Sequence, residues 1–345
     1  KYLWVRTPWY TENGVWRALN MFAFIAGLFT VCRSRIIRFA PDLVIASSTY
    51  TFDNWPAAYY AKKTKARYVY ELHDLWPLTL IEVAGMSRRH PFVQILQWAE
   101  NFACRRADKV ISLLPATLPH LVAHGMRPDR FAYIPNGIVE DEWVLRQPVP
   151  QSHVEAIRLF KQKMRWLVGY VGGHNDLDPL EQMLEAGVSP DLADVGFVLV
   201  GEGVKKVKLE RWAREKNSRV LFLPAVDKTV VPELLQLFDV LYLGMPNSPL
   251  YRFGISPNKL FEYMMAERPI LFVGNVANDL VAISGCGITV KSNDTKEICN
   301  ALRRILSMAY SERAVMGKRG RAYVERNHIV RVLALQFLDA IWPSG

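Results

Sequence analysis

The sequence predicts an α/β protein built from two doubly wound, Rossmann-like parallel-sheet domains. Short apolar, β-branched segments alternate with helical patterns along the whole chain, which is the pattern of repeated βαβ units. The length of 345 residues, with 50% hydrophobic and 22% charged residues, is enough for two domains with separate cores. Together these observations exclude a disordered chain.

Segments with strand character occur in both halves of the chain. In the first half they are residues 2–6, 42–47, 67–73, 109–114 and 131–136. In the second half they are residues 166–172, 196–203, 219–226, 239–244, 268–274 and 288–291. Helical patterns fill the intervals. The last of them, residues 311–342, is long, and Gly317 and Gly320 are its expected points of bending.

A polar segment with two prolines and no strand pattern separates the two sets of strands, between Gly137 and Trp166. We therefore expect one domain over residues 1–145 and a second over residues 146–327, with the C-terminal helix 328–345 returning to complete the first. The chain begins with Lys1 inside an expected strand and has no initiator Met. An N-terminal piece is accordingly expected to be missing.

The four cysteines indicate the compartment. Their spacing matches neither a metal-ligand pattern nor a disulfide framework, and they are Cys32, Cys104, Cys286 and Cys299. We expect them to be buried thiols in a reducing compartment, the cytoplasm. No stretch approaches the roughly 20 apolar residues that are needed to span a bilayer.

The net charge of +10 is concentrated near the N-terminus, because residues 1–70 hold ten Lys or Arg and three Asp or Glu, a balance of +7. Residues 17–39 have the pattern of a helix with a long apolar body, and the basic residues Arg33, Arg35 and Arg38 lie near its end. Two interpretations stay open, namely contact with an anionic membrane surface and a core helix with a solvated basic end. No nucleic-acid-binding module accompanies the charge, which argues against a nucleic-acid partner.

Residues 253–270 combine a polar helix start with a lone carboxylate. Ser256 is a predicted N-cap residue with Pro257 at the first helical position, which leaves backbone N–H groups for an anion such as a phosphate. Lys259, in the first turn, opposes the helix dipole unless an anion lies there. Glu262 follows among apolar residues, where a carboxylate needs a hydrogen-bonding partner. The segment predicts a nucleotide diphosphate site, and the alternative is a core helix with one surface Glu.

Two glycine-containing loops also follow apolar strands. Residues 172–174 lie where doubly wound domains often bind phosphate through backbone amides, and His174 could donate to a phosphate oxygen. Residues 201–203 form a turn that lets a ligand approach the backbone, and Lys205 and Lys206 begin the next helix. The alternatives are an ordinary strand-to-helix turn, surface lysines and a structural or solvated histidine.

A sequence of polar residues, ELHDLWP, follows the strand that ends near residue 73. In it, His73 lies between Glu71 and Asp74, which can orient and polarise the imidazole so that it shares a proton with a hydroxyl group. His73 and Asp74 are therefore the catalytic candidates. The alternative is that Asp74 caps the following helix and His73 forms only local hydrogen bonds.

Three segments together resemble a known family: ADKVISLLPATLPHLVAHGMRPDRFAYIPNGI, GEGVKKVKLERWAREK with RVLFLPAV, and SPNKLFEYMMAERPIL. In order and spacing they are similar to the retaining glycosyltransferases of family 4, which have the GT-B fold, and the resemblance covers nearly the whole chain. Together with TENGVWRALNMFAF and ELHDLWP, they most resemble the bacterial subgroup that acts in O-antigen, capsule or colanic acid synthesis.

The resemblance implies a nucleotide-sugar donor, a UDP-sugar, held mainly by the C-terminal domain. Glu262 would bind the ribose hydroxyls, and the start of its helix would meet the diphosphate. The donor-binding residues on this interpretation are Gly173, His174, Gly201, Glu202, Lys206, Val226, Gly254, Ser256, Pro257, Asn258, Lys259 and Glu262. The acceptor-side residues are Asn13, Gly14 and Arg17.

The resemblance also implies the chemistry. The sugar would pass with retention of configuration to a lipid-linked or polysaccharide acceptor at the cytoplasmic face of the membrane. The departing phosphate would accept the acceptor proton. No metal or other cofactor is required, because helix N-termini and basic side chains stabilise the leaving group.

The chain departs from the family pattern in three places. The sequence starts near the third strand of the family's N-terminal domain, so the first βα unit with its glycine-rich loop is expected to be absent. Residues 172–183 lack the Arg and Lys that many relatives carry there. Gly254 replaces the first Glu of the E-x7-E motif, a residue that commonly contacts the transferred sugar. Two alternative functions stay open. A nucleotide-sugar 2-epimerase shares the fold and the donor but needs no acceptor, and a catalytically silent GT-B subunit that binds a partner would fit the absent first loop.

Overall fold

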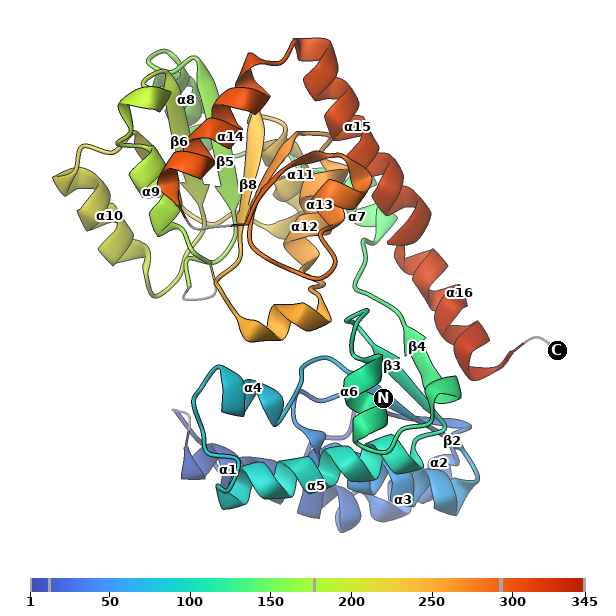
Figure 1. Cartoon of the computed structure of the whole chain (residues 1–345). Helices are drawn as coiled ribbons and strands as arrows, with labels where there is room; N and C mark the ends of the chain where they lie inside the picture. Colours follow the sequence, from blue (N-terminus) through green and yellow to red (C-terminus); the bar gives the residue numbers. More distant parts are fainter. Residues whose placement is uncertain (1, 12–13, 176–177, 292–293, 344–345) are drawn as a thin grey trace. The chain divides into compact units, whose positions relative to one another are not determined.

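The computed structural model describes residues 2–11, 14–175, 178–291 and 294–343 (Figure 1). The chain divides into two compact units. Unit 1 comprises Lys1–Pro135 together with Phe337–Gly345, and unit 2 comprises Asn136–Gln336. Each unit is an α/β structure with its own parallel sheet.

Unit 1 contains a four-stranded parallel sheet in the order β1-β2-β3-β4. The strands are β1 (Leu43–Ala46), β2 (Arg67–Leu72), β3 (Lys109–Ser112) and β4 (Phe131–Tyr133). The helices are α1 (Val15–Phe29), α2 (Arg33–Phe39), α3 (Asn54–Thr64), α4 (Leu78–Glu82), α5 (Pro91–Arg106) and α6 (Leu118–Ala123), with 3-10 turns η1 (Thr51–Asp53) and η2 (Pro128–Arg130). Helices α3 and α5 pack against β2 and against each other.

The strand predicted at residues 2–6 is not formed. Its described residues have no strand partner, and Tyr2 and Trp4 are almost fully exposed. A strand needs a neighbour for its backbone N–H and C=O groups, and β1 pairs with β2 alone. The aromatic alternation of this segment was therefore not sufficient evidence for a strand.

The helix expected at residues 17–39 is two helices, because α1 and α2 meet at a bend of 54°. Within the described ranges no single helix is long and apolar enough to cross a membrane, although this bent pair passes the same test of length and composition when its two helices are taken together. Met21 and Ile25 of α1 are buried, which accounts for part of the apolar character of the segment.

Unit 2 contains a six-stranded parallel sheet in the order β10-β9-β8-β5-β6-β7. The strands are β5 (Trp166–Val171), β6 (Val195–Val200), β7 (Val220–Leu223), β8 (Val240–Gly244), β9 (Ile270–Val273) and β10 (Gly287–Val290). The order reverses between β5 and β8, so this pair forms the topological switch point at which doubly wound sheets bind ligands.

Helices cover both faces of the unit 2 sheet (Figure 1). The helices of unit 2 are α7 (Glu140–Val144), α8 (Gln151–Lys161), α9 (Glu181–Ala186), α10 (Lys206–Glu215), α11 (Val231–Leu235), α12 (Asn258–Met265), α13 (Leu280–Ser284), α14 (Thr295–Ser307) and α15 (Tyr310–Asn327), with 3-10 turns η3 (Pro190–Leu192), η4 (Lys228–Val230) and η5 (Pro249–Phe253). Helix α16 (Val330–Ile341) begins in unit 2 and ends in unit 1. Along β6, Val198 packs with residues of α11 and α12, whereas Leu199 packs with residues of α9 and α14. Burial on both faces explains the continuous apolar sequence of this strand.

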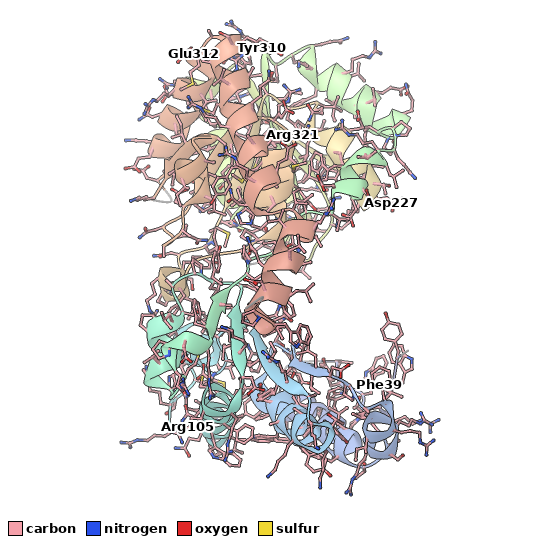
Figure 2. The ribbon with its side chains drawn as sticks, turned by 90° about the vertical axis from the view of Figure 1, so that its right-hand side faces the viewer. Phe39, Arg105, Asp227, Tyr310, Glu312 and Arg321 are labelled. Atoms are coloured by element: carbon pink, nitrogen blue, oxygen red, sulfur yellow. The ribbon has the colours of Figure 1, made fainter. Side chains whose placement is uncertain are left out.

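The glycines of α15 do not bend it. The helix is continuous through Gly317 and Gly320, and the break occurs at residues 328–329, before α16. A Cβ atom on Gly317 would lie 2.0 Å from the Glu267 carbonyl oxygen, so this glycine allows close packing against the end of α12. Arg321, which Figure 2 labels on α15, supports the same contact. It forms an ion pair with Glu267 at 2.9 Å.

Candidate functional site

Helix α12 begins one residue later than the sequence predicted. Pro257 precedes its first residue, Asn258, and no side chain caps it. The expectation that Ser256 is the N-cap residue is therefore wrong, since its side chain is used elsewhere. Ser256 Oγ accepts a hydrogen bond from the Asn136 backbone N–H at 2.8 Å, and its carbonyl accepts from the Asn136 amide at 2.7 Å. The first-turn N–H groups of an uncapped helix suit an anionic ligand.

Lys259 meets an anion, but this anion belongs to the protein. Its Nζ lies 2.7 Å from Asp178 Oδ1 and donates to the Tyr170 hydroxyl at 2.6 Å, and only 19% and 18% of the Lys259 and Asp178 side chains are exposed. The Tyr170 hydroxyl donates in turn to the Gly173 carbonyl at 2.6 Å. Burial lowers the pKa of Lys259, and Asp178 opposes that shift. Lys259 thus ties α12 to the loop after β5, with its charge compensated.

Two glycines bring the loops after β5 and β6 into direct contact. A Cβ atom on Gly201 would lie 1.9 Å from the Gly172 carbonyl oxygen, and one on Gly203 would lie 2.4 Å from the His174 carbonyl oxygen. The His174 backbone N–H donates to the Glu202 carbonyl at 2.9 Å. The turn at residues 201–203 therefore serves first to pack against the neighbouring loop at the carboxyl edge of the sheet.

His174 lies inside unit 2. Its exposed fraction is zero, and neither ring nitrogen has a hydrogen-bond partner within the described part of the chain. Burial lowers the pKa of His174 to about 4, so the imidazole is neutral at physiological pH. Its ring packs near those of Tyr170 and Phe222. The structure thus places the residue beside the loop backbone rather than in solvent.

Lys206 closes the turn after β6. Its Nζ donates to the Gly201 carbonyl at 2.9 Å and to Glu202 Oε1 at 2.7 Å, while the Glu202 carboxylate is largely exposed. The hydrogen bond from Lys206 lowers the pKa of Glu202. Val226, after β7, is half-buried against the apolar cluster of that face. The positive charge of Lys206, like that of Lys259, is already compensated.

Glu262 is the carboxylate of α12, and its environment favours a bound ligand. It is half-buried, and among the described residues it forms no hydrogen bond or ion pair. Burial is the main cause of the raised pKa of Glu262. A partly buried carboxylate without partners is costly, and hydroxyl groups of a bound ligand would satisfy it.

Gly254 occupies a backbone conformation that only glycine adopts readily, with φ 102° and ψ −178°. It ends the 3-10 turn η5 and leads into Ile255, whose backbone N–H and C=O are both bonded by the buried Asn278 amide at 2.7 and 2.8 Å. Gly254 is thus part of a firmly held loop.

In unit 1, three side chains meet at the carboxyl ends of β1 and β2. Ser47 Oγ donates to Glu71 Oε2 at 2.5 Å and lies 2.8 Å from His73 Nε2. His73 Nε2 lies 3.1 Å from Glu71 Oε2. This hydrogen bond raises the pKa of His73 and lowers the pKa of Glu71. The cluster orients the imidazole and favours its protonated form.

Asp74 forms local hydrogen bonds in the structure, which is the structural alternative that the sequence left open. Its two carboxylate oxygens accept hydrogen bonds from the Leu75 backbone N–H at 2.8 Å, the Trp76 indole at 3.0 Å and the Thr79 hydroxyl at 2.8 Å. With three donors from its own loop, Asp74 shapes the segment that follows His73.

The acceptor-side candidates lie at the start of α1. The Arg17 guanidinium lies 5.7 Å from the centre of the Trp76 ring, so the structure brings Arg17 to the loop after β2. Gly14 precedes the helix without a side-chain cap, and Asn13 lies outside the described residues.

Sequence reasoning missed four residues of these clusters. Ser47 directly follows an apolar strand, which is the same signal that selected His73. Asp53 is buried and accepts hydrogen bonds from the backbone and hydroxyl of Ser48, and burial raises its pKa to about 6. Asp178 gave only the weak signal of a carboxylate near a glycine loop, and Tyr170 gave none, because it lies within an apolar strand.

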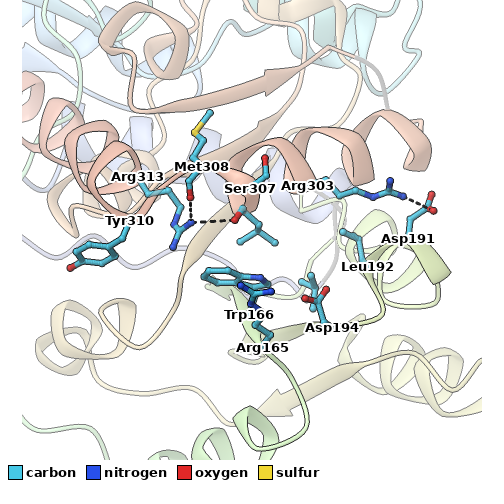
Figure 3. A pocket seen from close by; sticks show the side chains of 12 residues that line it. Arg165, Trp166, Asp191, Leu192, Asp194, Arg303, Ser307, Met308, Tyr310 and Arg313 are labelled. Atoms are coloured by element: carbon cyan, nitrogen blue, oxygen red, sulfur yellow. Dashed lines mark hydrogen bonds and ion pairs between the residues drawn. The ribbon is translucent and has the colours of Figure 1, made fainter.

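A cavity of about 560 Å³ lies in unit 2 at the amino ends of β5 and β6 (Figure 3). Its cations are engaged within the protein. Arg303 pairs with Asp191 at 2.5 Å, and Arg313 donates to the Leu306 carbonyl at 3.2 Å while its guanidinium lies 4.5 Å from the Trp166 ring centre. Ligands of open parallel sheets bind at the carboxyl edge instead, so this cavity is not the candidate site.

Comparison with known families assigns one domain family to each half of the chain. Residues 2–137 match the glycosyl transferase 4-like domain, and residues 165–308 match the glycosyl transferases group 1 domain. The chain belongs to the family 4 glycosyltransferases with the GT-B fold. The α/β fold with two Rossmann-like parallel-sheet units, expected from the sequence, is confirmed.

Individual relatives are more distant. The chain is 23% identical over 229 residues to WcaI of Escherichia coli K12, a protein named as a colanic acid biosynthesis glycosyl transferase, and the match covers 65% of this chain. The chain spans about half the length of this relative (55%). Anabaena Alr3699/HepE in complex with UDP and glucose has a TM-score of 0.65, with 17% identity over 92% of this chain and 83% of that one. WaaG, a glycosyltransferase involved in lipopolysaccharide biosynthesis, has a TM-score of 0.60, with 17% identity over 93% and 96%.

Proposed function

We propose that this glycosyltransferase moves a sugar from a UDP-sugar to a lipid-linked or polysaccharide acceptor in bacterial cell-surface polysaccharide synthesis, with retention of configuration. The observation on which the proposal rests is Glu262, a half-buried carboxylate without a partner in the described structure, on a helix that begins beside the switch-point loops. Support comes from the names of the relatives, which include UDP complexes and proteins of colanic acid and lipopolysaccharide synthesis.

In this proposal Glu262 accepts hydrogen bonds from the ribose hydroxyls, and the diphosphate lies at the N-terminus of α12. Lys259 and Lys206 are already paired with Asp178 and Glu202, so neither supplies an uncompensated charge. The N–H groups of the first turn of α12 and the loop amides then stabilise the leaving phosphate, without a required metal. Lys259 acts as a positioning residue for the loop after β5.

The residues of unit 1 serve the transferred sugar and the acceptor in the same proposal. His73, held by Glu71 and Ser47, donates a hydrogen bond to a hydroxyl of the transferred sugar. For transfer with retention, the acceptor oxygen attacks the face from which UDP departs, the bond to UDP breaks, and the acceptor proton passes to the released phosphate oxygen. His73 then needs no proton exchange of its own, which agrees with its raised pKa.

We further propose that unit 1 rests on the anionic inner face of the cell membrane. Exposed aromatic and basic residues near the start of the chain support this proposal: Trp4, Trp9, Trp16, Arg33, Arg35, Arg38 and Phe39. Phe39 is labelled in Figure 2. Aromatic rings and arginines favour the membrane interface, and each basic residue contributes about 1 kcal/mol. Replacing Arg35 and Arg38 by Gln should weaken binding to vesicles with anionic lipid roughly 30-fold. Equal binding to vesicles without anionic lipid would contradict the proposal.

The donor assignment is tested by calorimetric titration of UDP into the full chain. Hydrogen bonds to a charged group contribute about 1.5–3 kcal/mol, so Glu262→Ala should weaken UDP binding about 10- to 100-fold. The matched control is Glu215→Ala, which removes an exposed carboxylate of α10. Unchanged affinity in Glu262→Ala would overturn the assignment.

Two further outcomes separate the alternative functions. Isomerisation of the donor sugar without an acceptor, seen by NMR, would indicate a 2-epimerase. Donor binding without any transfer or donor hydrolysis in the purified protein would indicate a silent subunit.

A further inference from the structure

A cluster of side chains that can ligate a metal lies in unit 1, and none of its members has been discussed above. Glu100 belongs to α5, His120 belongs to α6, and His124 directly follows α6. One ligand atom from each of the three lies within 4.8 Å of the other two. His120 and His124 are one helical turn apart, so both imidazoles face α5.

We propose that Glu100, His120 and His124 form a binding site for a divalent transition metal ion, with Zn²⁺ as the best match. Two imidazoles and a carboxylate are a ligand set that zinc uses in proteins, with a fourth position for water. With Zn–N and Zn–O distances of about 2.0–2.2 Å, tetrahedral ligand atoms lie about 3.3–3.5 Å apart. His120 Nε2 and Glu100 Oε1 are 2.8 Å apart, so small side-chain movements would admit the ion.

The burial of Glu100 is the physical reason for expecting a cation. Its side chain is not exposed at all, and a buried carboxylate is costly unless a positive charge compensates it. Its ion-pair partner in the described structure is His120, which is charged only when protonated. A metal ion would supply the missing charge while both imidazoles stay neutral.

Outer hydrogen bonds already orient the ligands. The Gln97 amide donates to Glu100 Oε2 at 2.7 Å, which leaves Oε1 directed at His120. His124 Nδ1 lies 2.8 Å from Asn101 Oδ1 and 3.1 Å from Gln97 Nε2. Such outer partners fix ligand orientation in metal sites. His124 is only half-buried, so an ion can reach the cluster from solvent. The ion would join α6 to α5.

The test uses the full chain without a histidine tag, stripped with a chelator and titrated with Zn²⁺ alone. We expect one bound zinc per chain by mass spectrometry of the metal content, and a melting temperature that rises with Zn²⁺ concentration. Co²⁺ in place of Zn²⁺ should give the visible absorption of a tetrahedral site.

Removal of an outer-shell partner of a metal site lowers the metal affinity about 10- to 100-fold. His124→Asn removes a direct ligand, so it should lower the zinc affinity by at least that factor. His90→Asn is the matched control, because His90 is an exposed N-cap residue of α5 and Asn is also a good cap. Circular dichroism of both metal-free variants checks that they fold. Wild-type protein that binds zinc no more tightly than His124→Asn, or that gives no tetrahedral Co²⁺ spectrum, would overturn the proposal and leave only the contact between His120 and Glu100.

Discussion

The ion pair between Lys259 and Asp178 gives the sharpest prediction for unit 2. Removing one partner of a buried pair leaves the other charge uncompensated, which costs about 3–5 kcal/mol. Less than a fifth of either side chain is exposed, so this range applies. For a unit the size of Asn136–Gln336, about 1 kcal/mol corresponds to a shift of about 2–4 °C. Lys259→Met should therefore lower the melting temperature of this unit by about 6–20 °C.

The double variant Lys259→Met with Asp178→Asn carries neither charge and should regain most of that loss. Calorimetric melting of the two single variants and the double variant measures the coupling free energy. Lys208→Met, at an exposed position of α10, controls for removal of a lysine. If the two single effects simply add, with a coupling below about 0.5 kcal/mol, Lys259 is not held by Asp178.

Two further predictions concern the loop contact in unit 2 and the serine, glutamate and histidine cluster in unit 1. Gly201→Ala should lower the free energy of unfolding, measured by urea denaturation, by about 1–3 kcal/mol more than Gly85→Ala does, because the Cβ atom at position 201 would lie 1.9 Å from a backbone oxygen. Gly85 is the matched control, since it also has a positive φ but has open space around it. Equal losses in the two variants would contradict the close packing at Gly201. The pKa of His73 is raised above 6.5, so the stability gained from Glu71 is fully present below pH 6.5 and is lost as pH rises through the folded pKa. His73→Gln should flatten this pH dependence, and a dependence unchanged from the wild type would refute the link.

The alternation of apolar strands and helical patterns predicted most of the fold because the strands of unit 2 are buried on both faces and appear as continuous apolar runs. Residues 2–6 show the limit of that signal. Their aromatic residues match strand propensity, but a strand also needs a partner, and pairing is not visible in a short segment. Gly317 and Gly320 show a second limit, since a glycine in a helix can mark close packing as well as bending.

The candidate site was predictable where a polar residue directly follows an apolar strand or stands alone on an apolar helix. Glu262 and His73 were selected as candidates in this way. The partners of Lys259 were not, because Asp178 and Tyr170 are remote from it in sequence and only the fold brings them to its ammonium group. Sequence reasoning correctly required an anion near Lys259 but could not tell a ligand from a side chain.

The conformation of Gly254 limits how the enzyme could be redesigned. Restoring the glutamate of the family motif would place a residue with a Cβ atom at φ 102°, a backbone conformation that is strongly disfavoured for residues other than glycine. The neighbouring backbone cannot easily yield, because Asn278 binds both polar groups of Ile255. A glutamate at this position would therefore require a different conformation of the loop from Ser248 to Ile255, and natural variants that carry it should differ in loop length or turn type as well.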